Sequence, residues 1–568
     1  MKKIKYLIAS IIAISTVSCS DYFDINENPN ELHTDQAKPD QYLAAAQVGS
    51  YRVQATTMNR LGLLFGNAAG GNVQSFASPF TDEFQFNITN SFYNTIFDNL
   101  YLNVYTFQKI IDYNDGTNKY DGYKAISKIC KAYYMQYLVD LYGNIPYKDA
   151  FKGGVLSTPK YDDDQEVYQL LLQELDEART IIGKIDNHTI EAESVTTDVM
   201  LGGDLAKWKL FANTVELKML LRMSKNTGAV AAWRDQRIKN MALKGNTNFI
   251  NEDLTINPGY INDADARVNP FVATFGYDSG AVVTGRNLYC LSGHLAKCLN
   301  PYSDINYADA SEQEIILNKG VKYPDVLDPR RYRIFSTAAS NAPYHKAVTQ
   351  GSVTVDVYKP GGSSIGQPSK ISAAMFNPYN ETGNGTSLPN AGTGNFYAKV
   401  KGYVMTAAES KFLQAEAKLL STNGIAAFAD LNLPNAQTSF DDAVTATFPF
   451  YQSTMGTYLA TINTKSNFGY SDTFSFQENY HAIMYQKWIA TLNSNAIEAY
   501  INNTRTGFPL NPMPKGTTQT SRPKRLIYPI SEYVANSANV PNVSQAEVYD
   551  VNSKHMPFWL QGDPALGK

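Results

Sequence analysis

Apolar stripes with a spacing of three and four residues place the strongest limit on the fold of this chain. The stripes lie at residues 123–141, 167–181, 208–219, 404–419 and 484–500. Because residues three or four apart share one side of an α-helix, each stripe predicts a helix with one buried face. Several of these helices arrive as pairs joined by short polar turns. The pattern therefore predicts a mainly α fold class, a helical-hairpin array in which each hairpin buries its face against its neighbours.

The composition changes between about residues 245 and 400, where turn-forming residues interrupt the helical pattern. Examples are Asn257-Pro258-Gly259, the run Gly361-Gly362-Ser363-Ser364 and a stretch rich in Gly, Asn, Thr and Ser at 377–395. These residues favour turns, and loops on a rigid scaffold often carry binding sites. No linker divides the chain. We therefore expect one domain over 19–568, with a helical scaffold at about 38–244 and 401–568 and a loop-rich insertion at about 245–400.

The N-terminus has the organisation of a signal peptide. Lys2, Lys3 and Lys5 precede an apolar run at 6–17, which is shorter than the about 20 residues needed to span a bilayer. Thr16-Val17-Ser18 then leads into Cys19, a sequence that resembles the lipobox of bacterial lipoproteins. We expect removal of residues 1–18 and attachment of lipid, palmitate included, to Cys19. The alternative is an ordinary secreted protein in which Cys19 is incidental. The acidic stretch 20–24 resembles the export signal that Bacteroidetes lipoproteins carry toward the cell surface.

Charge and motif content argue against several functional classes. The formal net charge is −4, whereas nucleic-acid binding calls for a basic face. Gly362-Ser363-Ser364-Ile365-Gly366 matches the pattern of a hydrolase nucleophile turn, but prolines on both sides argue against the strand and helix that this turn needs. The six histidines show no metal-ligand spacing. We expect no catalytic, metal or cofactor site. Paired carboxylates for glycoside hydrolysis need only spatial proximity, so that alternative stays open here.

The cysteines offer little scope for cross-linking. Cys130, Cys290 and Cys298 follow the proposed anchor, and their odd number without a CxxC pair argues against a disulfide framework or a zinc cluster. Cys290 and Cys298 are close enough in sequence for pairing in an oxidising compartment, and both alternatives stay open. Cys130 lies in a helical stripe and is expected to be a buried thiol.

A series of short motifs, taken in order, resembles the SusD/RagB family of nutrient-binding outer-membrane lipoproteins. One of them is Asp-Leu-Tyr-Gly-Asn-Ile-Pro-Tyr at 140–147, and another is Arg-Thr-Gly-Phe-Pro at 505–509. The others lie at 23–30, 39–46, 207–214, 269–271, 328–331, 408–417, 486–490 and 525–529. The motifs span nearly the whole mature chain, and their physical roles are mostly structural.

The resemblance implies a tetratricopeptide-like scaffold with an inserted loop-rich region, and no chemistry or cofactor. It also implies a lid on a TonB-dependent outer-membrane barrel, a SusC-like transporter, that captures oligosaccharide or peptide at the cell surface. A surface glycan-degrading enzyme and a structural adhesin are the rival hypotheses.

An aromatic cluster in a polar stretch is the predicted ligand site. Four phenylalanines lie between Gly70-Gly71 and a helix expected to begin near Thr89, among residues that can form hydrogen bonds. Stacking faces beside polar edges suit a sugar or a peptide backbone. Phe97 stands where members of the resembled family often carry Trp, which weakens a carbohydrate assignment. The predicted ligand-binding residues are Phe76, Phe80, Phe84, Phe86, Phe97, Arg286 and Tyr289. Alternatively, these rings anchor the loop to the scaffold.

The anchor prediction can be tested by fractionation. Cys19→Ala removes the only thiol that could carry the lipid at the cleavage site, so the variant should stay uncleaved by the lipoprotein peptidase or leave the membrane. Wild-type protein processed in parallel is the control. Equal recovery of both proteins in the outer membrane would show that Cys19 is not the anchor.

Overall fold

The computed structural model describes residues 37–152, 156–261, 267–278, 281–300, 320–337, 344–357, 366–376 and 400–561. The predicted signal peptide, Cys19 and residues 362–365 of the Gly362–Gly366 motif lie outside these ranges. Among the described residues, none of the helices combines the length and the apolar character that a membrane crossing needs.

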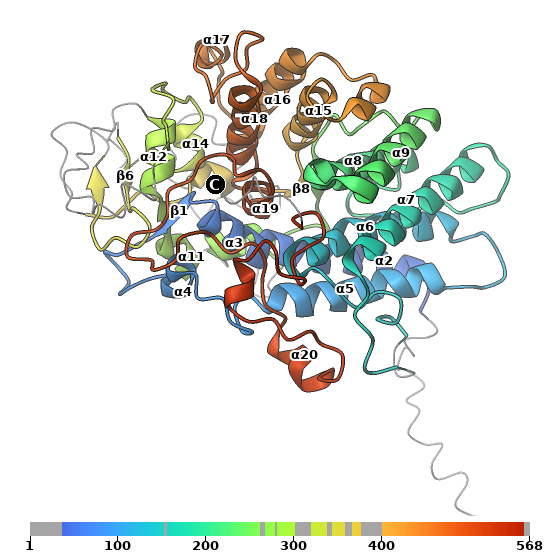
Figure 1. Cartoon of the computed structure of the whole chain (residues 1–568). Helices are drawn as coiled ribbons and strands as arrows, with labels where there is room; N and C mark the ends of the chain where they lie inside the picture. Colours follow the sequence, from blue (N-terminus) through green and yellow to red (C-terminus); the bar gives the residue numbers. More distant parts are fainter. Residues whose placement is uncertain are drawn as a thin grey trace, which may run out of the picture.

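The N-terminal half is a row of packed helices. α2 (Pro39–Val53) continues through a π-helical turn, η2 (Gln54–Met58), into α3 (Asn59–Phe65). The helices that follow are α4 (Thr81–Gln85), α5 (Thr95–Asp112), α6 (Asp121–Tyr142), α7 (Asp164–Asp186), α8 (Leu205–Arg222), η4 (Met223–Lys225) and α9 (Gly228–Leu243). α2, α5, α6, α7 and α8 pack on one another in succession, as Figure 1 shows on its right side. This arrangement confirms the predicted tetratricopeptide-like hairpin scaffold.

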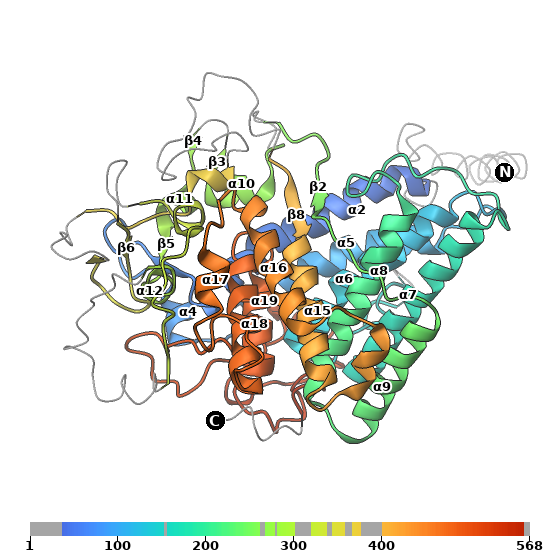
Figure 2. The ribbon, with the colours of Figure 1, turned by 90° about the horizontal axis from the view of Figure 1, so that it is seen from above.

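The C-terminal helices complete the scaffold. They are α15 (Ala407–Ser421), η8 (Ala426–Leu431), α16 (Ala436–Phe450), α17 (Tyr458–Ile462), α18 (Phe476–Thr491), α19 (Ile497–Thr506), α20 (Ile530–Ala535) and η9 (Ala546–Val548). α15 packs on α16 and α18 and also on α8. Figure 2 shows α15 between the C-terminal helices and the α6–α9 group. α15 therefore joins the two halves of the scaffold.

Local residues set where the helices begin and end. The Asp163 side chain accepts a hydrogen bond from the Glu166 N–H, so the acidic run there marks the start of α7. Ser475 and Glu478 form a reciprocal capping box at α18. At the other end of a helix, Gly143 has φ 73°, a value that favours glycine, and it terminates α6.

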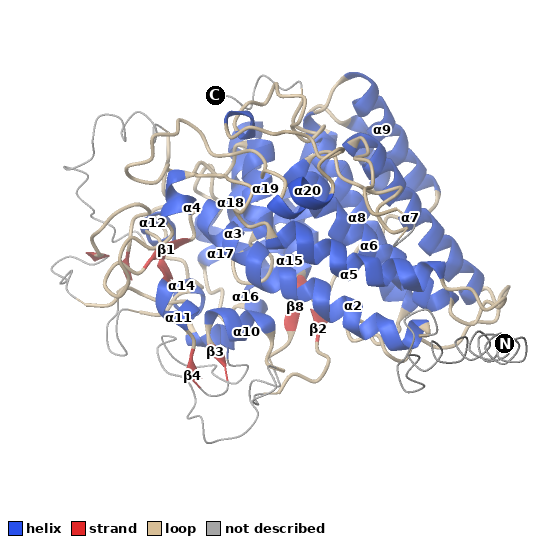
Figure 3. Ribbon diagram, turned by 90° about the horizontal axis from the view of Figure 1, so that it is seen from below, coloured by secondary structure: helices blue, strands red, loops and turns tan. Residues whose placement is uncertain are grey.

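The central region contains short helices and four two-stranded antiparallel sheets among the described residues. The pairs are β1 (Ala69–Gly71) with β5 (Tyr289–Leu291), β2 (Leu254–Ile256) with β8 (Gly402–Met405), β3 (Tyr277–Asp278) with β4 (Ala281–Val282), and β6 (Lys346–Ala347) with β7 (Asp356–Val357). The helices are α10 (Pro270–Phe275), α11 (Thr284–Leu288), α12 (Gly293–Leu299), α14 (Arg331–Ile334) and η6 (Ala373–Phe376). Figure 3 shows these strands beside the helical scaffold. β1 and β5 tie the region to the end of α3.

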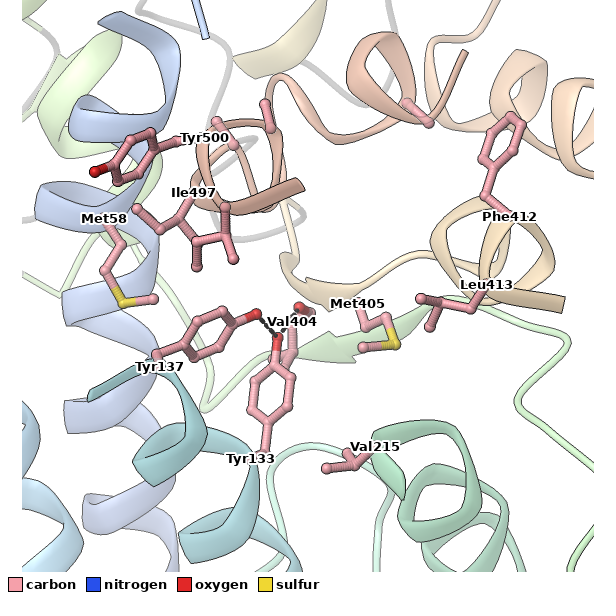
Figure 4. Close-up of a cluster of buried hydrophobic side chains, with 14 of the residues drawn as sticks. Met58, Tyr133, Tyr137, Val215, Val404, Met405, Phe412, Leu413, Ile497 and Tyr500 are labelled. Carbon is pink, nitrogen blue, oxygen red and sulfur yellow. Dashed lines mark hydrogen bonds between the residues drawn. The ribbon is translucent and has the colours of Figure 1, made fainter. Parts of the chain in front are cut away.

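Buried tyrosines fill seams between the helices. The hydroxyl of Tyr137 donates to that of Tyr133 at 3.1 Å, and Tyr133 donates to the Val404 carbonyl on β8 at 3.0 Å (Figure 4). Met58 and Ile497 lie beside them in the same apolar cluster. Hydroxyl groups that find partners let these large rings be buried without losing hydrogen bonds. Trp208 and Trp488 are also core residues, 0% and 2% exposed.

A buried network of charges lies where α6, α8, α15, α18 and α19 meet. Its cations are Lys218, Arg222, Lys487 and Arg505, and its carboxylates are Asp140, Glu409, Glu416 and Glu498; none is more than 2% exposed. The four positive and four negative groups balance. Arg222 binds Glu498 at 2.7 Å and Asp140 at 3.0 Å, and Arg505 binds Glu416 at 2.7 Å.

Asn502 links the two parts of this network, because its side-chain oxygen accepts from Arg222 at 3.1 Å and from Arg505 at 3.2 Å. Burial lowers the pKa of Lys487 to about 8 and raises that of Glu409. Desolvation therefore opposes the charged forms, and the network depends on its internal pairing.

The start of α19 crosses α3 at very short range. A Cβ atom on Gly62 would lie 2.0 Å from the carbonyl carbon of Ala496, so only glycine permits this approach. The Ala496 N–H also donates to the Asn59 side chain at 2.7 Å. The N-terminal and C-terminal halves are therefore interlocked at this crossing.

The cysteines within the described ranges are three buried free thiols, Cys130, Cys290 and Cys298. Burial raises the pKa of each. The disulfide that the spacing of Cys290 and Cys298 allows is thus absent from this structure, and Cys130 is buried as predicted.

Arg222 tests the importance of the charge network. Arg222→Met removes the guanidinium shared by Asp140 and Glu498, and should lower the free energy of unfolding by about 3–5 kcal/mol, as expected for an uncompensated buried charge. The matched control is Lys207→Met, which breaks the exposed pair with Glu252 and should leave the free energy of unfolding nearly unchanged, because exposed ion pairs contribute little. Urea unfolding followed by circular dichroism measures both. Equal costs would contradict a special role for the network.

Candidate functional site

A cavity of about 600 Å³ opens where the first helices meet the loop-rich region. Its walls come from η2 and α3, from α4, from residues 89–95, and from α10, α11 and β5. The lining residues are Thr56, Thr57, Arg60, Asp82, Glu83, Thr89, Ser91, Phe92, Tyr93, Asn94, Thr95, Thr274, Gly285, Leu288 and Tyr289. The volume lies in the range of small-molecule sites. Hydroxyl, amide and charged groups alternate with aromatic rings on the wall.

Arg60 is the central polar group of the wall. Its Nη2 atom lies 3.1 Å from Oε1 of Glu83, and the Tyr93 hydroxyl donates to the same oxygen at 2.9 Å. The Arg60 side chain is 43% exposed whereas that of Glu83 is only 7% exposed. Glu83 therefore holds the guanidinium from behind while part of Arg60 faces the cavity.

Aromatic rings fix this arrangement from several sides. The guanidinium carbon of Arg60 lies 5.6 Å from the centre of the Phe80 ring and 5.3 Å from that of Tyr93. Phe80 in turn packs on Tyr289, with ring centres 4.9 Å apart, and on Phe84 at 5.9 Å. Burial raises the pKa of the Tyr289 phenol, so the hydroxyl keeps its proton. The rings form a rigid back wall behind the polar groups.

Backbone strain concentrates in the same segment. Ser78, Phe80, Phe86 and Tyr93 have φ values of 46°, 63°, 54° and 53°, in the left-handed region that bulky residues rarely adopt. Such conformations cost roughly 1–3 kcal/mol each and persist where the surroundings enforce them, often at ligand sites. Gly71 makes the fold of this segment possible, since a Cβ there would lie 2.4 Å from Pro79.

Two family models match the sequence. The first, described as "Starch-binding associating with outer membrane", matches residues 29–308. The second, described as "Susd and RagB outer membrane lipoprotein", matches residues 369–561. The chain belongs to the SusD/RagB family.

Solved structures of SusD homologues share this fold. A chitin-binding SusD homologue from Flavobacterium johnsoniae has a TM-score of 0.64 at 19% identity, covering 92% of this chain and 99% of that chain. A SusD-like protein from Bacteroides thetaiotaomicron has a TM-score of 0.63 at 19% identity over the same shares. A SusD homologue from Bacteroides uniformis gives 0.63 at 18% identity, again over 92% and 99%. No match was found among curated proteins.

Three of the seven predicted ligand residues of this SusD/RagB protein lie at the cavity. Tyr289 is part of the wall, and Phe80 and Phe84 are buried directly behind it. Phe84 lies on the short helix α4. Phe76 is half-buried and lies outside the lining. The structure therefore brings three of the predicted residues together at the cavity, where two of them support the wall from behind.

Phe86, Phe97 and Arg286 lie in the core instead of on a ligand-accessible surface. Phe86 is 1% exposed, between Phe65 and Arg522. Phe97, 2% exposed, packs on Tyr101 and Tyr142 because its face of α5 turns toward α6.

The Arg286 guanidinium is buried between Tyr277 and Phe376, and it donates to the Tyr277 hydroxyl and to the Ile371 carbonyl. The structure therefore supports the alternative role for Phe86, Phe97 and Arg286, in which these side chains anchor their segments to the scaffold.

The predicted site does not include Arg60, Glu83 or Tyr93. Arg60 lies on a helix and meets Glu83 only through tertiary packing, so no local pattern marks it. A charged residue within the largely apolar stretch of α3 is the one signal that could have drawn attention to it. Within the described ranges, no cluster of three or more His, Cys, Asp or Glu residues could hold a metal ion.

Proposed function

We propose that this protein is a surface lipoprotein of the outer membrane that captures an oligosaccharide in the Arg60 cavity and passes it to a SusC-like TonB-dependent transporter. The observation that carries the proposal is a cavity that joins aromatic rings to many hydrogen-bonding groups, in a family described as starch-binding and as associated with the outer membrane. The chitin-binding homologues of similar fold point to the same class of ligand.

The chemistry of the wall suits a sugar. A pyranose presents apolar C–H faces and a rim of hydroxyl groups, which match the rings and the polar groups of the cavity respectively. Ser91, Asn94 and Thr95 line the mouth and can exchange hydrogen bonds with such a rim. The half-buried ring of Tyr93 adds apolar surface beside them. A peptide backbone could use some of the same groups, so a peptide is the second candidate ligand.

A binding role fits the carboxylates of the cavity better than hydrolysis does. Retaining and inverting glycosidases need two carboxyl groups that flank the scissile bond, one of them free to act as a general acid. Here the Glu83 carboxylate is paired with Arg60 and accepts a hydrogen bond from Tyr93. The other carboxylate of the cavity, Asp82, is the residue next to Glu83 on α4. These contacts support capture without chemistry, in preference to the enzyme and adhesin alternatives.

Arg60 provides a test of the binding site. Arg60→Met keeps the aliphatic stem between Phe80 and Tyr93 but removes the exposed donors, so affinity for a glycan found on an array should fall by roughly tenfold or more, as for hydrogen bonds to charged groups worth about 1.5–3 kcal/mol. Calorimetry measures the affinity and a thermal melt checks folding. Arg52→Met, at an exposed position on α2, is the matched control. If Arg60→Met binds the glycan as tightly as wild type, the site lies elsewhere.

The transporter can be tested by purification. If the protein closes over a barrel, the contact should be large enough to survive mild detergent yet able to separate. Affinity purification from solubilised outer membrane should therefore recover a TonB-dependent transporter of about twice this mass. Cys19→Ala protein, released from the membrane, serves as the control. Recovery of the protein alone in mild detergent without dissociating salt would count against the partnership.

A further inference from the structure

The charges on the wall of the Arg60 cavity do not cancel. Among its lining residues one cation, Arg60, faces two carboxylates, Asp82 and Glu83. Arg60 and Glu83 are paired at 3.1 Å, and the buried Glu83 receives a second hydrogen bond from Tyr93. The formal charges of this pair cancel, although part of the Arg60 guanidinium faces the cavity, so the net formal charge of the lining residues is that of the remaining carboxylate.

Asp82 is that remaining group. It is exposed on the first turn of α4, and its Oδ1 atom accepts a hydrogen bond from the amide of Asn87 at 3.0 Å. No cation within the described residues lies within ion-pairing distance of it. The Asn87 contact holds the carboxylate in place without neutralising it, because an amide carries no net charge.

The aromatic rings of the wall also favour a positively charged ligand group. Phe92, Tyr93 and Tyr289 line the cavity, and the faces of such rings carry partial negative charge that attracts cations. One ring face, that of Tyr93, is already used by Arg60 at 5.3 Å. A carboxylate and electron-rich rings together favour a positively charged group on a ligand and disfavour a negatively charged one.

From this balance we infer that the cavity selects oligosaccharides that carry a protonated amine, such as 2-amino-2-deoxy sugars, over uncharged sugars and over uronic acids, and that Asp82 is the residue that determines this selection. The inference rests on the proposed glycan-binding function and refines it. Asp82 acts as a charge partner of the ligand and takes part in no chemical step.

Two tetramers that differ only in whether their amino groups are acetylated provide the test. The N-acetylglucosamine tetramer and its fully deacetylated, cationic counterpart are titrated into the mature protein by calorimetry, at slightly acidic pH and at low and high salt. The cationic tetramer should bind roughly two- to fivefold more tightly at low salt, as for one partly exposed ion pair, and the difference should shrink at high salt.

Variants assign the effect to Asp82. Asp82→Asn should remove the preference for the cationic tetramer, so that the two tetramers bind this variant with equal affinity. Asp472→Asn, at an exposed position outside the cavity, is the matched control and should keep the preference.

Each other result is decisive. Equal binding of both tetramers to the wild type, or a preference that persists in Asp82→Asn, overturns the inference. If neither tetramer binds but a neutral or acidic glycan from an array does, the inference fails while the proposed function stands. If no glycan binds at all, both fail.

Discussion

Ionic pairing between buried side chains is the interaction on which the rest of this structure depends. Helices from both halves of the chain send charged side chains to one buried point, where four cations meet four carboxylates. Each charge would be costly alone, and each is tolerable only when all partners are in place. The arrangement therefore specifies one packing of α6, α8, α15, α18 and α19, where apolar faces alone would permit several.

The rigidity of the scaffold explains how the cavity keeps its shape. Its walls come from segments that are far apart in sequence, with Arg60 on α3 and Tyr289 on β5. β1 follows α3 directly and pairs Gly71 with Tyr289, so the aromatic wall is fastened to the same helix that presents Arg60. Positive φ angles at Phe80 and Tyr93 are held by this packing. Well-packed side chains behind the cavity therefore hold these strained backbone conformations in place.

Much of the scaffold could be predicted from the sequence, because helical periodicity and capping act over a few residues. The stripe through Tyr133 and Tyr137, the start of α7 at Asp163 and the end of α6 at Gly143 all follow from local rules. The charge network could not be predicted, although several of its members lie in the motifs that identify the family. Arg222 and Glu498 are 276 residues apart, and their meeting depends on tertiary packing.

The site shows the same division between local and tertiary information. The sequence identifies an aromatic, polar stretch around Phe80 and places Tyr289 opposite. It does not reveal that Phe86 turns inward, because a loop has no period from which a buried face can be inferred. Phe97 lies in the first turn of α5, and its burial depends on which face of that helix meets α6. It also does not pair Arg60 with Glu83, since a helix residue and a residue of a separate short helix meet only in the folded chain.

The contact between Gly62 and Ala496 also constrains the order of events during folding. Asn59 and Ala496 are 437 residues apart, and a chain is synthesised from its N-terminus. α3 therefore stays without its partner until most of the polypeptide has emerged, and closing so long a loop is slow compared with local helix formation. Arg60 belongs to the same helix. A truncated or stalled chain can form its early hairpins but cannot finish the cavity, so ligand capture becomes a property of completed molecules alone.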